Sequence, residues 1–383
     1  MLVLFLYLSA VGILWWCAQG YFLYLFWRKT NLPKKNPVEP CSNNGISSIS
    51  SFSIIVPTYN EKHLINQKIA NLKTLNYPDY HVYFSDASND GTDEIISSAI
   101  LGHSNYNLIR VAVPGRSSQI NKALSLIKNG IVVITDVDAF FEQDLLQKLA
   151  DIFLDKTIGV VGGYVSPDTK YKTDISFWKV QNTTRLVEGL CGHSPVVSGA
   201  GYAFRREIIN EIPQDTWADD IYVPFTANLN GFCSIYSSEI SIREVRAPEK
   251  FSDFFKIKVR KTHDNIKELL RSFPKIFAMR FEWFVIYITR FLQIIVSPFL
   301  ILMLLILVFF QNPAVIISSI LLVFITGIVQ KILSGKLVKE KISAWETVKI
   351  FMITEFVLLY AVLFYFFRKN RIPYTKMGTI AKQ

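Results

Sequence analysis

The sequence predicts an α/β domain with a doubly wound, mostly parallel sheet, flanked by apolar segments that cross a membrane. Two observations lead to this fold class. Strand and helix patterns alternate in the long polar central part of the chain, which favours a parallel sheet covered by helices. In addition, the 383 residues are 50% hydrophobic and only 19% charged, which is too apolar for an ordinary soluble protein.

The apolar residues are concentrated at the two ends of the chain. Residues 2–27 contain no charge, residues 291–332 contain a single one, and residues 345–367 are mostly apolar. A helix needs about 20 apolar residues to span the bilayer core. We therefore expect one transmembrane anchor within residues 1–29 and two or three transmembrane helices within residues 283–367.

The charges that follow the first apolar segment indicate its orientation. A cleaved signal peptide would carry a basic region ahead of the apolar run, and none is present. Basic residues follow the run instead, at Arg28, Lys29, Lys34 and Lys35. By the positive-inside rule, we expect an uncleaved anchor and a cytoplasmic central domain. Residues 30–50, rich in Pro, Asn and Ser, are predicted to be a linker.

The formal net charge of +10 indicates an anionic partner. Much of the excess lies beside the predicted spans, including the basic tail at residues 368–383, which favours membrane lipids over nucleic acid, for which we find no motif. The four cysteines form no CxxC pair and the five histidines form no HxxxH or HExxH motif. Neither a zinc site nor a disulfide framework is therefore predicted, which fits a reducing cytoplasm.

The central domain, residues 51–245, begins with a regular succession of elements. Strands are expected at residues 52–60, 81–86, 107–113 and 131–136, and helices at residues 61–75, 92–101 and 119–128. In parallel sheets of this type, ligands bind beyond the carboxyl ends of the strands. The polar and acidic residues at those ends form the candidate site: Pro57, Thr58, Tyr59, Asp86, Asp136 and Asp138.

The fourth predicted strand ends in two carboxylates. Residues 131–141 read IVVITDVDAFF, so Asp136 and Asp138 lie two residues apart and point to the same face of an extended chain. Their charges repel unless a cation lies between them. An Asp-rich turn that caps the next helix would show the same pattern, so the pair alone leaves both interpretations open.

Two further acidic stretches strengthen the cation interpretation. They place Asp86 and Asp90 in SDASNDGT, and Asp219 and Asp220 in WADDIYVP. Mg²⁺ and Mn²⁺ commonly use one or two carboxylates together with substrate phosphates, so we expect Mg²⁺ or Mn²⁺ and a phosphate-bearing substrate. Asp219 and Asp220 would also suit a helix N-terminus. The glycines of SGAGYA, residues 198–203, allow either close approach of a substrate or a plain turn.

Basic and aromatic residues intermingle after the central domain. Residues 246–282 contain phenylalanines together with Lys256, Lys258, Arg260 and Lys261, which is typical of amphipathic helices at a membrane surface. A solvated helix that packs on the domain would show the same pattern.

Six ordered motifs resemble those of family 2 glycosyltransferases with the GT-A fold. They read IIVPTYNE (54–61), SDASNDGT (85–92), GRSSQINKAL (115–124), TDVD (135–138), SGAGYAFRRE (198–207) and ADDIYVPFTANLNGF (218–232). The resemblance covers residues 52–261, and the flanking apolar segments are similar to those of the membrane-integrated branch of the family. It implies a Rossmann-like GT-A catalytic domain at the cell membrane of a bacterium or archaeon.

The resemblance also implies roles for individual residues. Four residues would line the nucleotide pocket: Pro57, Thr58, Tyr59 and Glu61. Asp86 would bind the base, and Arg116 stands where relatives often carry a lysine near the nucleotide. Asp136 would lie by the ribose or the metal, and Asp138 would hold the metal on the diphosphate. Asp220 would be the general base, with Asp219 beside it.

One motif departs from the pattern of processive relatives. Those carry Q-x-x-R-W after the catalytic domain, whereas residues 257–261 keep only Arg260, with Ile257 and Lys261 in place of the glutamine and tryptophan. Arg260 would reach the donor diphosphate or the acceptor, and the usual acceptor stacking on tryptophan would be missing.

The resemblance thus implies an inverting, metal-dependent transfer of a sugar from a nucleotide donor, UDP-linked, to a growing cell-surface polysaccharide or a lipid-linked acceptor. A polyprenyl-phosphate sugar transferase is the alternative enzyme. A membrane transporter or scaffold with a degenerate nucleotide-binding domain is the alternative from another class. The sequence leaves the donor sugar, the linkage and the oligomeric state open.

Overall fold

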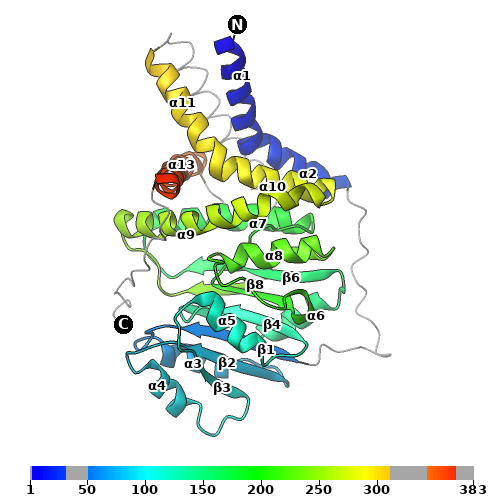
Figure 1. Cartoon of the computed structure of the whole chain (residues 1–383), viewed down its shortest axis with the longest axis vertical. Coiled ribbons are helices and arrows are strands. Elements are labelled where there is room, and N and C mark those ends of the chain that lie inside the picture. Colours follow the sequence, from blue (N-terminus) through cyan, green and yellow to red (C-terminus); the bar gives the residue numbers. More distant parts are fainter. Residues whose placement is uncertain (1, 32–50, 311–342, 368–383) are drawn as a thin grey trace. The chain divides into compact units, whose positions relative to one another are not determined.

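The computed structural model of the chain describes residues 2–31, 51–310 and 343–367, which form two compact units (Figure 1). The first, here called the sheet unit, comprises residues 51–168 and 188–247. The second, here called the helical unit, comprises residues 2–31, 169–187, 248–310 and 343–367.

The sheet unit is built on an eight-stranded sheet with the strand order β3-β2-β1-β4-β7-β6-β8-β5. Its strands are β1 Phe52–Thr58, β2 Tyr80–Asp86, β3 Tyr106–Arg110, β4 Ile131–Thr135, β5 Ala139–Phe141, β6 Ile158–Pro167, β7 Gly201–Arg205 and β8 Cys233–Glu244. Its helices are α3 Ile65–Lys73, α4 Thr92–Ala99, α5 Arg116–Leu124, α6 Leu145–Phe153, η2 Arg206–Ile208 and α8 Asp219–Leu229. The α/β fold class predicted from the sequence is confirmed.

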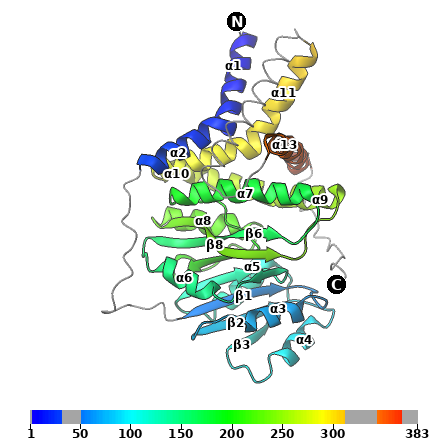
Figure 2. The same ribbon diagram turned by 180° about the vertical axis from the view of Figure 1, so that it is seen from behind.

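The half of the sheet formed by β1 to β4 is parallel, as predicted. β1 pairs with both β2 and β4 (Figure 1), and β2 pairs with β3 (Figure 2). The other half is mixed, because β7 runs antiparallel to β4 and β6, and β5 runs antiparallel to β8. The carboxyl ends of β1, β2 and β4 therefore meet at one edge of the sheet, where Thr58 lies opposite Asp86.

Two helices begin at other residues than predicted. α3 begins at Ile65, because Asn60 adopts a left-handed backbone conformation (φ 56°) and the loop after it bonds to neighbouring side chains. The backbone N–H of Glu61, for example, donates to Thr92 Oγ1 at 2.9 Å. α5 begins earlier than predicted, at Arg116. Arg116 is thus the first helical residue after the loop that follows β3.

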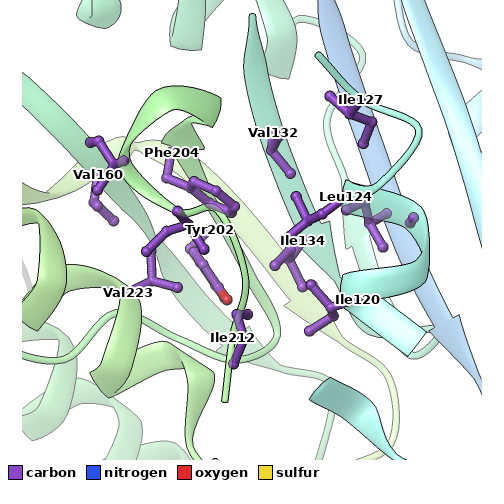
Figure 3. Packing of buried hydrophobic residues seen from close by; sticks show 14 of the residues in the cluster. Ile120, Leu124, Ile127, Val132, Ile134, Val160, Tyr202, Phe204, Ile212 and Val223 are labelled. Atoms are coloured by element: carbon purple, nitrogen blue, oxygen red, sulfur yellow. The ribbon is translucent and has the colours of Figure 1, made fainter. Parts of the chain in front are cut away.

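A hydrophobic cluster fixes α5, β4, β7 and α8 to one another (Figure 3). Its fully buried members include Ile120, Leu124, Val132, Ile134, Phe204 and Val223. Because interiors are close-packed, displacing one of these elements would open a void against the others. The cluster therefore sets the positions of the residues that begin α5 and α8 and of those that end β4.

The described residues of the helical unit form four long helical stretches besides α7. Its elements are α1 Leu2–Trp15, η1 Trp16–Gly20, α2 Tyr21–Asn31, α7 Lys172–Leu190 (through Val187), α9 Phe251–Ser272, η3 Phe273–Ala278, α10 Phe281–Phe291, η4 Leu292–Val296, α11 Ser297–Phe310 and α13 Ala344–Phe367. η1 and η4 are π-helical turns, which leave backbone carbonyls without their usual partners. Gln293 of η4 donates through its Nε2 to the Cys17 carbonyl of η1 at 2.7 Å, so a side chain of one π-helical turn satisfies a backbone carbonyl of the other.

Residues 169–187 lie inside the catalytic domain predicted over residues 51–245, which stays a prediction, and by their contacts they group with the helical unit. The physical reason is aromatic packing. On α7, Phe177 contacts Phe254 of α9 edge-on, with ring centroids 5.6 Å apart. The other predicted domain boundaries stay predictions.

The prediction that the basic side chains in residues 246–282 face lipid headgroups is wrong for Lys258. Its Nζ lies 2.9 Å from Asp174 Oδ1 and 3.9 Å from the centroid of the Phe177 ring, and its side chain is 8% exposed. Lys256 and Lys261 are exposed, as predicted. α9 packs against α13 through an apolar face that includes Val259. The helix is thus amphipathic, but one of its basic side chains belongs to the interior.

Among the described residues, two helical stretches are long and apolar enough to cross a membrane, Phe281–Met303 and Val348–Phe367. Residues 2–31 are helical throughout but are not among these two, so the N-terminal anchor stays a prediction. The choice between two and three C-terminal spans depends on residues 311–342, which lie outside the described residues, as do the predicted basic tail and residues 32–50 of the predicted linker. Residues 30–31 of that linker belong to α2 instead.

The Lys258–Asp174 pair yields a stability prediction. Asp174→Ala leaves a buried ammonium without its carboxylate, so we expect a loss of about 3–5 kcal/mol. Lys256→Ala, on the exposed side of the same helix, is the control and should change stability by less than about 0.5 kcal/mol. Thermal unfolding of the purified full-length protein measures both. Equal midpoints for the two variants would show that Lys258 is hydrated like its neighbours.

Candidate active site

Asp86 ends β2 at the edge where β1 also ends, and its carboxylate is held by three donors. The residue is 2% exposed and accepts hydrogen bonds from Thr58 Oγ1 at 2.6 Å, from Ser88 Oγ at 2.6 Å and from the Ser88 backbone N–H at 3.0 Å. Rotation of the carboxylate would leave buried donors unsatisfied, which is costly. Asp86 is therefore a rigid acceptor at this edge of the sheet.

A cavity of about 520 Å³ opens beside Asp86, a size that suits a nucleotide-sized ligand. It is lined by Tyr59, Asp86, Ala87, Ser88, Asn89, Asp93, Arg110, Val111, Ala112 and Pro114. Tyr59 is 41% exposed, so its ring is available for stacking on a planar ligand. Of the residues predicted to line a nucleotide pocket, Tyr59 and Asp86 line this cavity, whereas Pro57, Thr58 and Glu61 do not.

Arg116 connects three segments that are distant in sequence. Its Nε donates to Asp219 Oδ1 at 2.6 Å, its Nη1 donates to Asp136 Oδ1, and its Nη2 donates to the Gly199 carbonyl at 3.1 Å. Burial by itself would lower the pKa of the guanidinium, but the charges of Asp136 and Asp219 raise that pKa well above its ordinary value. The structure therefore brings together the predicted residues Arg116, Asp136 and Asp219 around a permanent positive charge.

Asp219 and Asp220 begin α8 but have different surroundings. Asp219 is 3% exposed, and it accepts a hydrogen bond from the Tyr202 hydroxyl at 2.6 Å in addition to that from Arg116. Burial and the Asp219 charge raise the pKa of the Tyr202 phenol, which keeps it a donor. Asp220 is half-buried and accepts the Gly199 backbone N–H at 3.1 Å. Asp219 is thus fixed in a charged network, while Asp220 is more accessible.

Asp138 lies in an acidic environment with one nearby guanidinium. Burial, followed by the charges of Asp136 and Glu244, raises the pKa of its carboxyl to about 7, and Glu61 adds to this while Arg246 opposes it. Arg246 forms a two-pronged ion pair with Glu61, at 3.2 and 2.5 Å, and its Nε lies 3.8 Å from Asp138 Oδ2. Negative charge at this turn is therefore only partly compensated by the protein.

The turn that carries Asp136 and Asp138 fits a hard divalent cation. A cation would favour the ionised form of a carboxyl that burial and like charges otherwise destabilise. Carboxylate oxygens are also the ligands that Mg²⁺ and Mn²⁺ prefer. Within the part of the chain that the structure describes, no three or more His, Cys, Asp and Glu side chains are grouped to hold a metal. The remaining ligands of such a cation would be substrate or water oxygens.

Two basic residues beside these carboxylates are not predicted from the sequence. Arg246 belongs to the segment predicted to lie at the membrane surface, and Lys68 lies in a predicted helix, where a lysine side chain is usually exposed. Lys68 is 0% exposed, and its Nζ donates to Thr135 Oγ1 at 2.9 Å and to the Ala139 carbonyl. Burial lowers the pKa of its ammonium to about 7, although the carboxylates of the Asp136–Asp138 turn oppose this.

Arg260 belongs to the helical unit, on α9. Its Nη1 lies 3.7 Å from Asp264 Oδ2, one helical turn away. Its predicted contact with a donor diphosphate or an acceptor stays a prediction.

Residues 53–213 match the family model described as Glycosyl transferase family 2. This part of the chain is thus a family 2 glycosyltransferase domain. The match extends from β1 through β7, including the Asp86 cavity and the Asp136–Asp138 turn, and ends before α8. We found no curated protein whose sequence matches this chain.

A similar solved structure is the mannosyltransferase PcManGT from Pyrobaculum calidifontis, in complex with GDP-Man and Mn²⁺. The identity is 20%, the TM-score is 0.69, and the alignment covers 95% of this chain and 100% of that one. At this identity the likeness shows the fold alone, and it confirms the GT-A fold predicted from the sequence.

Two other solved structures are less similar. Staphylococcus aureus TarS 1-349 in complex with UDP is 15% identical over 82% of this chain and 91% of that one, with a TM-score of 0.46. Glucosyl-3-phosphoglycerate synthase from Mycobacterium tuberculosis, in complex with Mn²⁺, UDP and glucosyl-3-phosphoglycerate, is 13% identical over 57% of this chain and 79% of that one, with a TM-score of 0.40. Neither likeness supports a conclusion about this chain.

The three contacts of Arg116 yield a prediction. An ammonium cannot reproduce the planar, multi-donor geometry of the guanidinium, so Arg116→Lys should leave a buried acceptor unsatisfied and cost about 1–3 kcal/mol. Arg110→Lys is the control, because the Arg110 side chain is 66% exposed and pairs with Asp93. Thermal unfolding compares the two. A midpoint for Arg116→Lys equal to that of the control would contradict the bridging role.

Proposed function

We propose that the chain transfers a sugar, with inversion, from a nucleoside diphosphate donor to a growing cell-surface polysaccharide or glycolipid. The observation that carries this proposal is the arrangement at one edge of the sheet. A cavity with a rigid carboxylate, Asp86, lies at the ends of β1–β3, and the acidic turn of Asp136 and Asp138 follows the neighbouring strand β4. A nucleoside and its diphosphate need these two environments side by side.

The nucleoside would bind in the Asp86 cavity. Tyr59 would stack on the base, while the fixed oxygens of Asp86 would accept an N–H of the base edge. UDP is the donor nucleotide that we propose. GDP is the alternative, because the similar Pyrobaculum structure is in complex with GDP-Man. The other residues predicted for the nucleotide pocket, Pro57, Thr58 and Glu61, would act indirectly. Thr58 would do so through its hydrogen bond to Asp86, and Glu61 through its ion pair with Arg246.

The diphosphate would lie over the Asp136–Asp138 turn. Asp138, with Asp136, would hold Mg²⁺ or Mn²⁺, in keeping with the Mn²⁺ of the Pyrobaculum structure. When bound, the cation would neutralise the charge that develops on the leaving diphosphate. Arg116 would orient Asp136, and Arg246 offers a second positive charge beside Asp138. Arg260 would supply a further cation, as the family resemblance implies.

Asp220 would act as the general base. An acceptor hydroxyl oxygen attacks the anomeric carbon, the bond from that carbon to the diphosphate oxygen breaks, and Asp220 takes the hydroxyl proton. Attack opposite the leaving group inverts the anomeric centre. Asp219 is poorly suited to this role because Arg116 and Tyr202 occupy its carboxylate. Its function would be to fix the start of α8, and thereby Asp220.

The acceptor would be delivered at a membrane. The two apolar helices Phe281–Met303 and Val348–Phe367 support membrane integration, and the basic residues that follow the first apolar segment support a cytoplasmic sheet unit. We propose the cell membrane of a bacterium or archaeon, where a polysaccharide or lipid-linked acceptor meets a cytoplasmic nucleotide donor. Exposed Lys256 and Lys261 would contact anionic headgroups.

A radiolabelled transfer assay tests the proposal. The purified full-length protein is incubated with labelled UDP-sugars and GDP-sugars, divalent cation and membrane extract, and the product is fractionated. Cation-dependent label in polymer or glycolipid supports the proposal. Label in an acid-labile lipid phosphate would instead identify a polyprenyl-phosphate sugar transferase. No transfer from any donor would favour a non-catalytic membrane protein.

The assignment of the base yields a prediction. Asp220→Asn keeps the shape of the side chain and its acceptor oxygen for the Gly199 N–H, but it cannot take a proton. We expect unchanged donor affinity and a loss of transfer of about 10²-fold or more, because a base acts only in the transition state. Isothermal titration with UDP and the transfer assay measure the two quantities. Weakened donor binding with unchanged turnover would make Asp220 a binding residue instead.

A further inference from the structure

Side chains on α3 form several hydrogen bonds with the end of β4 and the segment that follows it. Lys68 Nζ donates to Thr135 Oγ1 at 2.9 Å, just before the Asp136–Asp138 turn, and to the Ala139 carbonyl, just after it. One helical turn further along, Asn71 Nδ2 donates to the Phe141 carbonyl at 2.8 Å, and Asn71 Oδ1 accepts the Phe141 N–H at 2.9 Å. The ends of the acidic turn are thus fixed by the same helix.

Lys68 is an unusual choice for this buried position. It is 0% exposed, and its ammonium lies 4.5 Å from the centroid of the Phe141 ring. Burying a charge costs free energy unless it is paired and hydrogen-bonded, and an apolar side chain of similar length would fill the same space. Thr135 Oγ1 also lies 3.1 Å from the Ala200 carbonyl, to which it donates. The ammonium is therefore linked through Thr135 to the loop that contains Gly199.

We propose that Lys68 is a positioning residue that sets the turn between Thr135 and Ala139 so that Asp136 and Asp138 present their carboxylates to one divalent cation. The inference rests on the proposed function, in which these two carboxylates hold the cation. Lys68 itself touches neither the cation nor the donor. It acts through the backbone of Ala139 and the hydroxyl of Thr135.

Electrostatics and positioning predict effects of opposite sign. A positive charge near a cation site weakens cation binding, so on charge alone the loss of Lys68 should tighten it. If Lys68 positions the turn, its loss should weaken cation binding in spite of that gain. Removing groups that orient metal ligands typically costs 10–100-fold in metal affinity. The sign of the change therefore distinguishes the two effects.

The experiment measures Mn²⁺ binding by the purified full-length protein, by electron paramagnetic resonance, with and without UDP. We expect Lys68→Met to weaken Mn²⁺ binding by about tenfold or more. Thr135→Val removes one acceptor of Lys68 but keeps the volume and the buried charge, and it should weaken binding less, in the same direction. Lys73→Met is the control, because Lys73 is exposed on the same helix and donates to the Ala99 carbonyl.

Unchanged or tighter Mn²⁺ binding by folded Lys68→Met overturns the inference while the proposed function stands. Thermal unfolding shows whether that variant is folded. If it is not, Thr135→Val decides, and an unchanged Mn²⁺ affinity in this variant overturns the inference. A wild-type protein that binds no Mn²⁺, with or without UDP, refutes the proposed cation site and the inference together.

Discussion

The arrangement of the candidate active site depends on one partly buried guanidinium. Arg116 pairs at once with Asp136, at the end of β4, and with Asp219, at the start of α8, and it also bonds the carbonyl of Gly199. Without this cation, two carboxylates and a loop carbonyl would face one another, and of the two carboxylates Asp219 would keep only the hydrogen bond from the Tyr202 hydroxyl, which is costly in a partly desolvated site. The hydrophobic cluster around Ile120 fixes α5, and so holds the first residue of that helix in place.

The same balance of charges extends to the turn after β4. Asp138 is surrounded mainly by acidic side chains, and its nearest basic partners approach from two directions: Arg246 lies 3.8 Å from its carboxylate, and Lys68 lies beneath the turn, bonded to Ala139. The protein thus neutralises the turn only in part. A turn that keeps uncompensated negative charge is suited to a cation that arrives together with an anionic diphosphate.

The sequence predicts the parts of this site that lie at strand ends, and few of the parts that depend on burial. Asp86 and Asp138 could be placed because parallel strands bring their carboxyl ends to one edge. Lys68 could have been found, since it lies three residues after Ile65 and four before Leu72, on the apolar face of α3, but a single lysine in such a pattern is usually exposed. The role of Arg246 and the buried ion pair of Lys258 could not be predicted from the sequence. Their partners, Glu61 and Asp174, are far away along the chain, and only the fold brings them close.

The central claim is that the carboxylates after β4 hold a cation on the diphosphate of the donor. The most direct measurement is isothermal titration of the full-length protein with UDP and with uridine, each with and without Mn²⁺. We predict that Mn²⁺ strengthens UDP binding by about tenfold or more, a usual size for coupled binding, and leaves uridine binding unchanged. Equal UDP affinities with and without Mn²⁺ would contradict the account.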